Sequence, residues 1–340
     1  MTPSDSKPTM QLPKKSELKF DANESPFNSP MNRYPDATAA TLRESWGRHE
    51  RIPASCIYFC NGTEEAVDHV MRIYAPERTD SVVSVTPTRS VYKRRAEINR
   101  LVFREVELRP DNFELDAEAL LDSVDNSTRL IFLCSPNNPT GNLLDSESIE
   151  TILDLFEGMV VVDESYIDFI PQATLLRLLN KYKNLILLRS FSHAWSSAGA
   201  RLASVVAHPE VIKKLERVGF THPISSLVIA YAEELMERRL DIDKWSRQII
   251  DERTKVVAAL KDVPGCLEIY PSVTNFLLVR FDEVDSVYKY LKSQGIAVRP
   301  IHGVLRITIG LPGENSALVG ALRRRVMPGN ENKQDGLFEV

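Results

Sequence analysis

The run LIFLCSPNNPTG, residues Leu130–Gly141, decides the fold, because it joins a wholly apolar strand directly to a polar turn. Every position of Leu130–Cys134 is apolar, so both faces of this strand must be covered. Asn138, Pro139 and Gly141 then end the strand, since these residue types favour turns. Such a strand, followed at once by polar residues, is typical of a parallel sheet that carries a ligand site at its carboxyl edge.

Four more runs share this pattern, and amphipathic stretches separate them. The apolar runs are Ser81–Val85, Met159–Val162, Leu185–Leu188 and Ala203–Ala207. The helical patterns between the runs are Thr63–Tyr74, Asp145–Phe156 and Thr174–Lys183. Buried strands that alternate with helices predict an α/β fold, in which helices cover both faces of a mostly parallel sheet.

The chain changes character in its last third. A long helical pattern over Ile224–Leu260 is followed by shorter elements at Leu267–Tyr270, Asn275–Val279, Val284–Gln294 and Leu305–Ile309. This order predicts a small α+β domain. We therefore divide the chain into an N-terminal arm (1–31), a large domain (32–236), a small domain (237–326, with part of the N-terminal segment) and a disordered tail (327–340).

Composition narrows the classes of function. The chain has 340 residues, a net charge of −5 and 43% hydrophobic residues, which is typical of a globular protein and argues against nucleic acid or an anionic membrane as partner. The four cysteines form neither a disulfide framework nor a metal-site spacing, so we expect reduced thiols and no metal. No apolar run has the length of a membrane span. We expect a cytoplasmic protein that acts on a small molecule.

Polar residues directly follow four of the apolar runs. The segments are TPTRS (86–90), SPNNPTG (135–141), DESY (163–166) and SFSHAW (190–195). The carboxyl ends of parallel strands meet at one edge of a sheet. We therefore expect these hydroxyls, amides, carboxylates and the imidazole to converge on one pocket.

A series of motifs in this order resembles the fold-type I aminotransferases, which use pyridoxal 5′-phosphate (PLP). The motifs are NGTEEA (61–66), SPNNPTG, VVDESY (161–166), SFSHAWSSAGARLA (190–203) and LRITIG (305–310). The opening DANESPFNSPMNRYPD (21–36) and the close LRITIGLPGENSALVGAL (305–322) are most similar to the histidinol-phosphate aminotransferases. The resemblance, which runs from Phe20 to Val326, implies a homodimeric PLP enzyme of histidine biosynthesis. Such an enzyme transfers an amino group between histidinol phosphate (or imidazole acetol phosphate) and 2-oxoglutarate (or glutamate).

The resemblance assigns a phosphate site to residues near the predicted strand ends. Gly62 and Thr63 begin a helix, and the free amides of a helix N-terminus suit a phosphate; a plain helix cap is the alternative. By resemblance, the rest of the phosphate site is Ser190, Ser192 and Arg201. The arginine would supply charge-assisted hydrogen bonds.

Further residues match positions around the ring of PLP and the substrate. Asp163 ends an apolar strand, where a carboxylate needs a partner; the resemblance supplies the protonated pyridine nitrogen, and a structural salt bridge is the alternative. Asn138 and Tyr166 match the pair that hydrogen-bonds the phenolic oxygen of PLP. Arg306 matches the arginine that binds the substrate carboxylate. Tyr34 matches a tyrosine that reaches the cofactor phosphate of the neighbouring subunit.

The sequence departs from the family at two positions beside the cofactor. His193 stands where the family has the lysine that binds PLP covalently, and imidazole cannot form that bond. Arg89 stands where the family has an aromatic ring stacked on PLP. PLP, if bound, would therefore be held without a covalent bond.

Three hypotheses follow for catalysis. In the first, PLP binds and His193, with a pKa near neutrality, acts as a general base. In the second, the chain is a catalytically impaired or purely binding protein on the same fold. In the third, His193 is a substitution in an otherwise ordinary aminotransferase. A decarboxylase of phosphorylated amino acids is a further enzymatic alternative.

Overall fold

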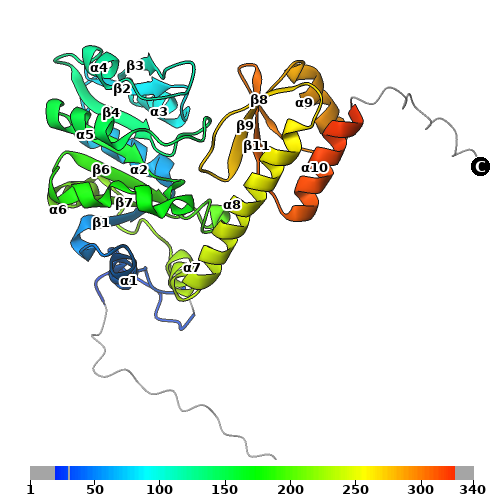
Figure 1. Ribbon diagram of the computed structural model, residues 1–340. Coiled ribbons are helices and arrows are strands. Elements are labelled where there is room, and N and C mark those ends of the chain that lie inside the picture. Colours follow the sequence, from blue (N-terminus) through cyan, green and yellow to red (C-terminus); the bar gives the residue numbers. More distant parts are fainter. Residues whose placement is uncertain (1–19, 30, 326–340) are drawn as a thin grey trace, which may run out of the picture.

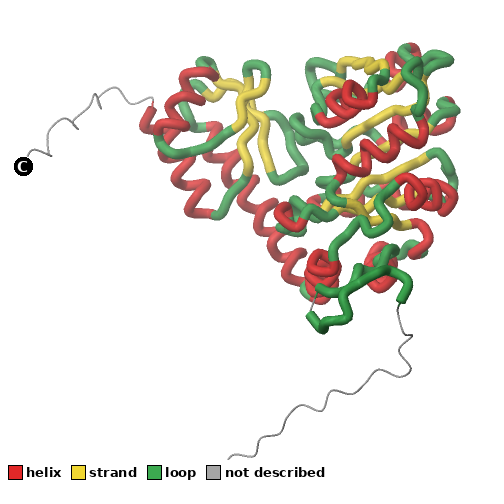
Figure 2. Tube along the Cα trace, turned by 180° about the vertical axis from the view of Figure 1, so that it is seen from behind, coloured by secondary structure: helices red, strands yellow, loops and turns green. Residues whose placement is uncertain are grey.

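The computed structural model describes residues 20–29 and 31–325, so the predictions for residues 1–19 and 327–340 lie outside the described part. The described chain forms two bodies, each built on one sheet, and the long helix α8 (Arg239–Lys261) runs from one body to the other (Figure 1). Seen from behind, helices and loops surround the strands of each body (Figure 2).

The larger sheet has seven strands in the order β1-β7-β6-β5-β4-β2-β3. The strands are β1 Ile57–Cys60, β2 Ser81–Thr86, β3 Val102–Glu107, β4 Thr128–Cys134, β5 Met159–Asp163, β6 Leu185–Ser190 and β7 Ala203–Ala207. The pairs from β6 to β3 are parallel, and only β7 is antiparallel to its neighbours. The predicted mostly parallel α/β sheet is therefore confirmed.

Alternating residues of one strand enter two separate cores. In β4, Leu130, Phe132 and Cys134 face the first core, whereas Ile131 and Leu133 face the second. The covering helices are α1 Ala40–Glu50, α2 Thr63–Tyr74, α3 Val91–Asn99, α4 Ala117–Asp122, α5 Ser146–Leu155, α6 Pro209–Val218 and α7 Ser226–Glu237. Because both faces are covered, residues 130–134 of this strand are all apolar, and polar residues lie only at its start and beyond its end.

The smaller sheet has four antiparallel strands in the order β10-β11-β9-β8. Its strands are β8 Cys266–Ile269, β9 Phe276–Phe281, β10 Arg299–Ile301 and β11 Val304–Thr308, and it packs with α8, α9 Val284–Ser293 and α10 Pro312–Arg325 around a third core. The predicted division at residues 236 and 237 falls at the end of α7 and stays a prediction.

The structure differs from the sequence prediction in three places. Residues 175–180 form a 3₁₀ helix, at whose start the Glu164 carboxylate accepts hydrogen bonds from Leu175 N and Thr174 Oγ1. The long pattern over 224–260 is two helices, α7 and α8, separated at Arg238. β7 runs antiparallel because the connection from β6, residues 191–202, contains no α-helix that could carry the chain back for a parallel strand.

Candidate active site

The strand register places the predicted site segments at one edge of the large sheet. Asp163 pairs with Cys134 on one side and Leu188 on the other. Ala203 lies between Ser190 and Cys60. Six loops therefore meet at this edge: those that follow β1, β2, β4, β5 and β6, and the one that precedes β7.

The residues assigned to a phosphate gather around the start of α2. Gly62 has φ +87°, a conformation that favours glycine, and the Arg201 guanidinium lies against it, 2.6 Å from the position that a Cβ would take. Thr63 is the first residue of the 12-residue helix, whose initial N–H groups have no partner within the helix. On β6 and the loop beyond it, the Ser190 hydroxyl accepts a hydrogen bond from Ser192 N at 3.1 Å.

Asp163 is fully buried at the end of β5 and has a complete set of donors. Ser165 donates its backbone N–H at 3.0 Å and its hydroxyl to one oxygen, and Tyr92 donates its hydroxyl to the other at 2.9 Å. The Arg89 guanidinium forms an ion pair with that second oxygen. Burying a carboxylate requires such compensation, and this aspartate finds its partners within the chain itself.

A second polar group connects the two bodies. Arg306, on β11, donates to Asn138 Oδ1 at 2.8 Å, and Asn138 Nδ2 donates to the Tyr166 hydroxyl at 2.6 Å. The His193 ring stacks on Tyr166 with 4.3 Å between ring centroids and 21° between planes. Burial raises the pKa of Tyr166 to about 12, so its phenol stays protonated at neutral pH.

Burial and the nearby Arg89 and Arg306 guanidinia lower the pKa of His193 to about 4, although Asp163 acts in the opposite direction. The sequence-based expectation of a pKa near neutrality was therefore wrong. Sequence reasoning could not place an imidazole between two arginines that are remote in the chain. At neutral pH His193 is therefore an uncharged ring, with one nitrogen that can donate a hydrogen bond and one that can accept one.

This lowered pKa makes folding stability depend on pH. The imidazole has a pKa of 6.5 when unperturbed and about 4 in the folded protein, so the unfolded chain takes up the proton first as pH falls. Above pH 6.5 the imidazole is neutral in both states, so it does not change the free energy of unfolding. Between pH 6.5 and 4 the unfolded chain binds a proton that the folded protein does not, and the free energy of unfolding falls. Asparagine does not titrate, so over this range the free energy of unfolding of His193→Asn should fall by about 2–3 kcal/mol less than that of the wild type. Urea unfolding at several pH values measures it; parallel wild-type and variant curves would contradict this assignment.

Two arginines face each other across the β10–β11 hairpin. Arg299 and Arg306 are register partners and line a cleft of about 680 Å³ that also includes Arg89 and Asn138. Among the described residues, no carboxylate lies within ion-pair distance of either guanidinium. Like charges placed directly opposite each other destabilise a sheet unless an anion lies between them. The arrangement therefore suits an anionic group of a ligand.

Arg299 is a site residue that sequence reasoning missed. The turn residues His302 and Gly303 have φ of 38° and 82°, the left-handed conformation of a two-residue hairpin turn. With a two-residue turn at HG, counting outward pairs position 299 with position 306. The segment RPIHGVLR (299–306) therefore pairs the two arginines, provided that HG is first recognised as a hairpin turn.

Tyr34 lies away from this cleft in the single chain. Its ring stacks on His222, with 4.8 Å between centroids, and 61% of the residue is exposed. Its predicted contact with a neighbouring subunit stays a prediction.

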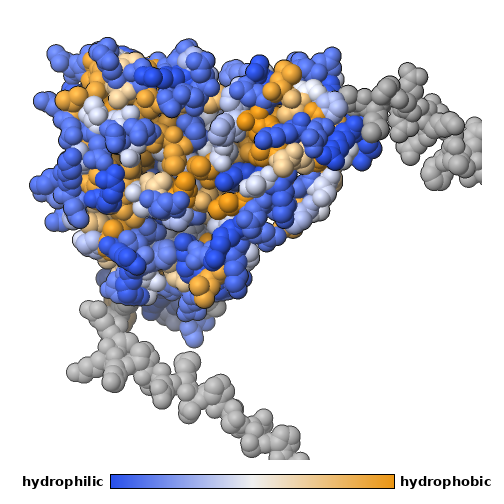
Figure 3. All heavy atoms as spheres, viewed as in Figure 1, coloured by the Kyte–Doolittle hydropathy of each residue, from blue (hydrophilic) through white to orange (hydrophobic). Residues whose placement is uncertain are grey.

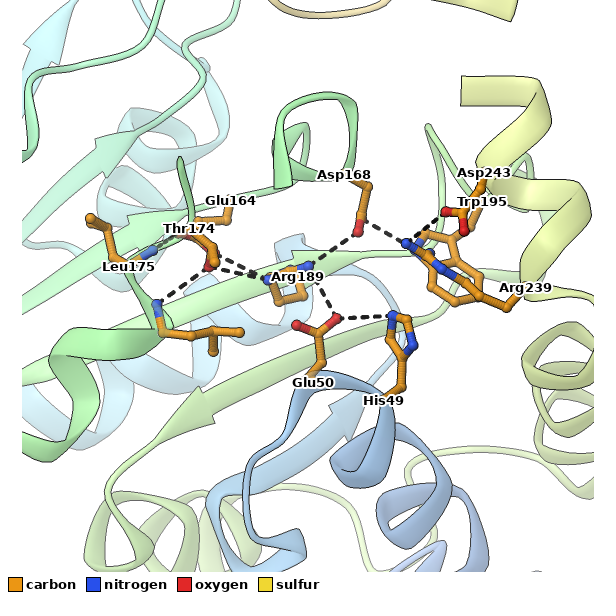
Figure 4. A network of polar contacts seen from close by, with 11 residues as sticks. His49, Glu50, Glu164, Asp168, Thr174, Leu175, Arg189, Trp195, Arg239 and Asp243 are labelled. Atoms are coloured by element: carbon orange, nitrogen blue, oxygen red, sulfur yellow. Dashed lines mark hydrogen bonds and ion pairs between the residues drawn. The ribbon is translucent and has the colours of Figure 1, made fainter. Parts of the chain in front are cut away.

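A buried ionic network surrounds Arg189 at the end of β6 (Figure 4). Arg189, on β6, contacts Glu50 at 3.2 Å, Glu164 at 3.3 Å and Asp168 at 3.1 Å. Asp168 also accepts a hydrogen bond from Trp195 Nε1 at 3.2 Å. Since Asp168 and Trp195 are each two residues from a member of the Tyr166–His193 stack, the network positions both rings.

Comparisons with known proteins define the class. The sequence profile of the family "Aminotransferase class I and II" matches residues 6–322. The histidinol-phosphate aminotransferase of Parabacteroides distasonis is 40% identical over 310 residues, which is 89% of this chain and 90% of that protein. The chain belongs to the class I and II aminotransferase family.

Solved structures agree on the fold. The histidinol-phosphate aminotransferase of Clostridium acetobutylicum superposes with a TM-score of 0.80 at 19% identity, over 87% of this chain and 91% of that one. A histidinol-phosphate aminotransferase of Sinorhizobium meliloti, solved in complex with pyridoxal-5′-phosphate, gives 0.78 at 22% identity, over 86% and 82% of the two chains. At this level of identity the likeness establishes the fold alone.

PLP is the cofactor of this family, and the residues at the sheet edge fit most of it. The glycine and arginine at the start of α2 suit its phosphate, and the Asn138–Tyr166 pair suits its phenolic oxygen. Two features do not match: His193 offers no primary amine, and Arg89 already pairs with Asp163. Among the described residues, no cluster of histidine, cysteine or acidic side chains is arranged to hold a metal ion, and no helix has the length and apolarity to cross a membrane.

Proposed function

We propose that this protein binds PLP without a covalent bond and transfers an amino group between histidinol phosphate and 2-oxoglutarate, a reaction of histidine biosynthesis. The single observation that carries the substrate is the Arg299–Arg306 pair, which suits a phosphate monoester in the cleft. The similarity to histidinol-phosphate aminotransferases supports the same substrate. When bound, PLP supplies a ring that withdraws electrons from the carbon bearing the amino group.

The residues of this chain would divide the remaining tasks. Arg299 and Arg306 bind the phosphate of histidinol phosphate in one half of the reaction and a carboxylate of glutamate in the other. His193 stands next to Tyr166 and is uncharged at neutral pH, so its free ring nitrogen can take the proton from the substrate, although a pKa of about 4 makes it a weak base. Because it replaces the lysine, exchange between cofactor and substrate has no amine from the protein to assist it, and turnover is slow.

A purely binding protein on the same fold is the second candidate, favoured by the missing amine at residue 193. One assay separates the two. Purified protein is supplied with PLP, histidinol phosphate and 2-oxoglutarate, and glutamate is measured. Glutamate formed by the wild type and not by His193→Ala supports catalysis; equal background from both proteins, with substrate still bound, supports the binding role.

Removing the paired arginines should weaken substrate binding. We expect Arg306→Ala to cost about 1.5–3 kcal/mol of histidinol-phosphate affinity, because a charge-assisted contact to the ligand is lost. Arg299→Ala should weaken the same affinity by a smaller amount, since this arginine is more exposed. Isothermal titration measures both. Arg280→Ala, on the exposed side of β9, is the matched control. Unchanged affinity in both cleft variants would place the phosphate elsewhere.

We also propose a homodimer in which Tyr34 reaches the cofactor phosphate of the neighbouring subunit. Large apolar side chains are exposed along the N-terminal segment and near α7 and α8, namely Phe20, Phe27, Phe220, Leu227 and Leu240. In the space-filling view, hydrophobic surface is present over α7 and the beginning of α8 (Figure 3). Exposed apolar surface of this kind favours association. Sedimentation at micromolar concentration tests the proposal; a monomer that binds PLP as tightly as a dimer would exclude a shared site.

A further inference from the structure

Arg89 lies between the two ends of the cofactor site. Its Nη1 forms the ion pair with Asp163 and is 3.2 Å from Ser165 Oγ. Its Nη2 is 3.2 Å from Thr63 Oγ1. Asp163 is the expected partner of the pyridine nitrogen, and Thr63 begins the helix expected to hold the phosphate. One guanidinium therefore spans the space in which the ring of PLP would lie.

The acceptor capacity of Asp163 strengthens this point. An ionised carboxylate offers about four lone-pair sites for hydrogen bonds. Asp163 already accepts four, from Ser165 N, Ser165 Oγ, Tyr92 Oη and Arg89 Nη1. A protonated ring nitrogen would be a fifth donor, so one of the four must leave. Ser165 is held by its backbone and Tyr92 is fully buried, whereas Arg89 has a long side chain at the wall of the cleft.

We propose that Arg89 is an internal counter-ion that occupies the position of the PLP ring and must move away before the ring can pair with Asp163. In the protein without cofactor, Arg89 compensates the buried carboxylate and stabilises the fold. Cofactor binding then has to break a buried ion pair, which reduces its apparent affinity by the fraction of molecules in which Asp163 is free. This inference rests on the proposed function only in taking PLP as the ligand.

The opposite role would leave a different signature. If Arg89 instead took over the stacking role of the family's aromatic ring, its removal would weaken PLP binding. If Arg89 is an internal counter-ion, its removal should lower the stability of the cofactor-free protein and raise its affinity for PLP. Its removal leaves a buried carboxylate without its cation, which destabilises the cofactor-free protein. The same removal frees Asp163 for the pyridine nitrogen, which tightens PLP binding.

The test compares the wild type with Arg89→Ala, Arg89→Met and Arg89→Lys. Thermal unfolding without cofactor measures stability, and a titration followed by PLP absorbance measures affinity. We expect Arg89→Ala to lower the unfolding midpoint and to tighten PLP binding roughly tenfold or more. Arg89→Met keeps most of the side-chain volume and serves if the alanine variant does not fold. Arg89→Lys keeps a cation beside Asp163 and should bind PLP close to the wild-type affinity.

Arg129→Ala is the matched control, because Arg129 pairs at 3.1 Å with the buried Asp80 at the amino edge of the same sheet. It should lower the midpoint and leave PLP affinity unchanged. PLP binding that is unchanged or weaker in both Arg89→Ala and Arg89→Met, while the wild type binds PLP, would overturn the inference alone. An absence of PLP binding in the wild type and in every variant would overturn the proposed function, and the inference with it.

Discussion

A His193→Lys variant is expected to hold PLP covalently at residue 193. The residue lies beside Tyr166 at the edge where the phosphate and ring positions meet, and a lysine side chain is long and flexible enough to reach the PLP carbonyl. A covalent link makes the rebinding of PLP intramolecular, so the retention of PLP should rise at least about a hundredfold. Borohydride treatment followed by peptide mass analysis should find the cofactor on residue 193 of the variant and on no peptide of the wild type.

Two further variants make this result interpretable. His193→Gln removes the imidazole without adding an amine and should not be labelled. The double variant with Arg89→Ala should be labelled faster than His193→Lys alone, since Asp163 is then free to receive the ring. Labelling of the wild type on another lysine would show that the SFSHAW segment does not occupy the family's lysine position.

An Arg189→Met variant should be the most destabilised single substitution outside the hydrophobic cores. Among the described residues, the guanidinium is the only cation in contact with Glu50, Glu164 and Asp168. His49 lies 3.6 Å from Glu50, but burial lowers the pKa of its imidazole to about 4, so it is uncharged at neutral pH. Burial raises the pKa of Glu164, whereas Arg189 lowers it. Removing one partner of a buried ionic group costs about 3–5 kcal/mol, because the remaining charges lose their compensation. The shift of the urea midpoint measures it.

The control is Arg280→Met, which breaks an exposed pair with Glu268 on the small sheet. Exposed pairs contribute little to stability, so its midpoint should stay at the wild-type value. An Arg189→Met midpoint equal to that of this control would mean that the carboxylates are protonated in the folded protein. The network would then not be ionic.

Much of the architecture was predictable because burial on both faces leaves a simple trace in the sequence. Runs such as Leu130–Cys134 are apolar throughout, since alternate residues enter different cores. β3 gave no such signal, because it lies at the edge of the sheet and carries Arg104, Glu105 and Glu107. β10 was missed because it has only three residues and includes a proline.

The site was predictable to the level of its segments and not of its contacts. The order of the motifs indicated Asp163 and Arg89 as neighbours of one ligand. Their ion pair with each other joins residues 74 positions apart and depends on the packing of α3 against the sheet edge. The pKa of His193 likewise depends on Arg89 and Arg306, which come from different bodies of the fold. Local patterns in a sequence carry no information on such pairings.

The helix α8 connects the network around Arg189 to the small sheet. Arg239, in the first turn of α8, packs over the Trp195 ring at 4.8 Å and pairs with Asp243 at 3.0 Å. With 23 residues, α8 is about 35 Å long and reaches the small sheet at its other end. The contact with Trp195 lies two residues from His193, so a tilt of α8 by about 5° about this contact would move its far end by about 3 Å. In this way α8 joins the loop that carries His193 to the small sheet that carries Arg306.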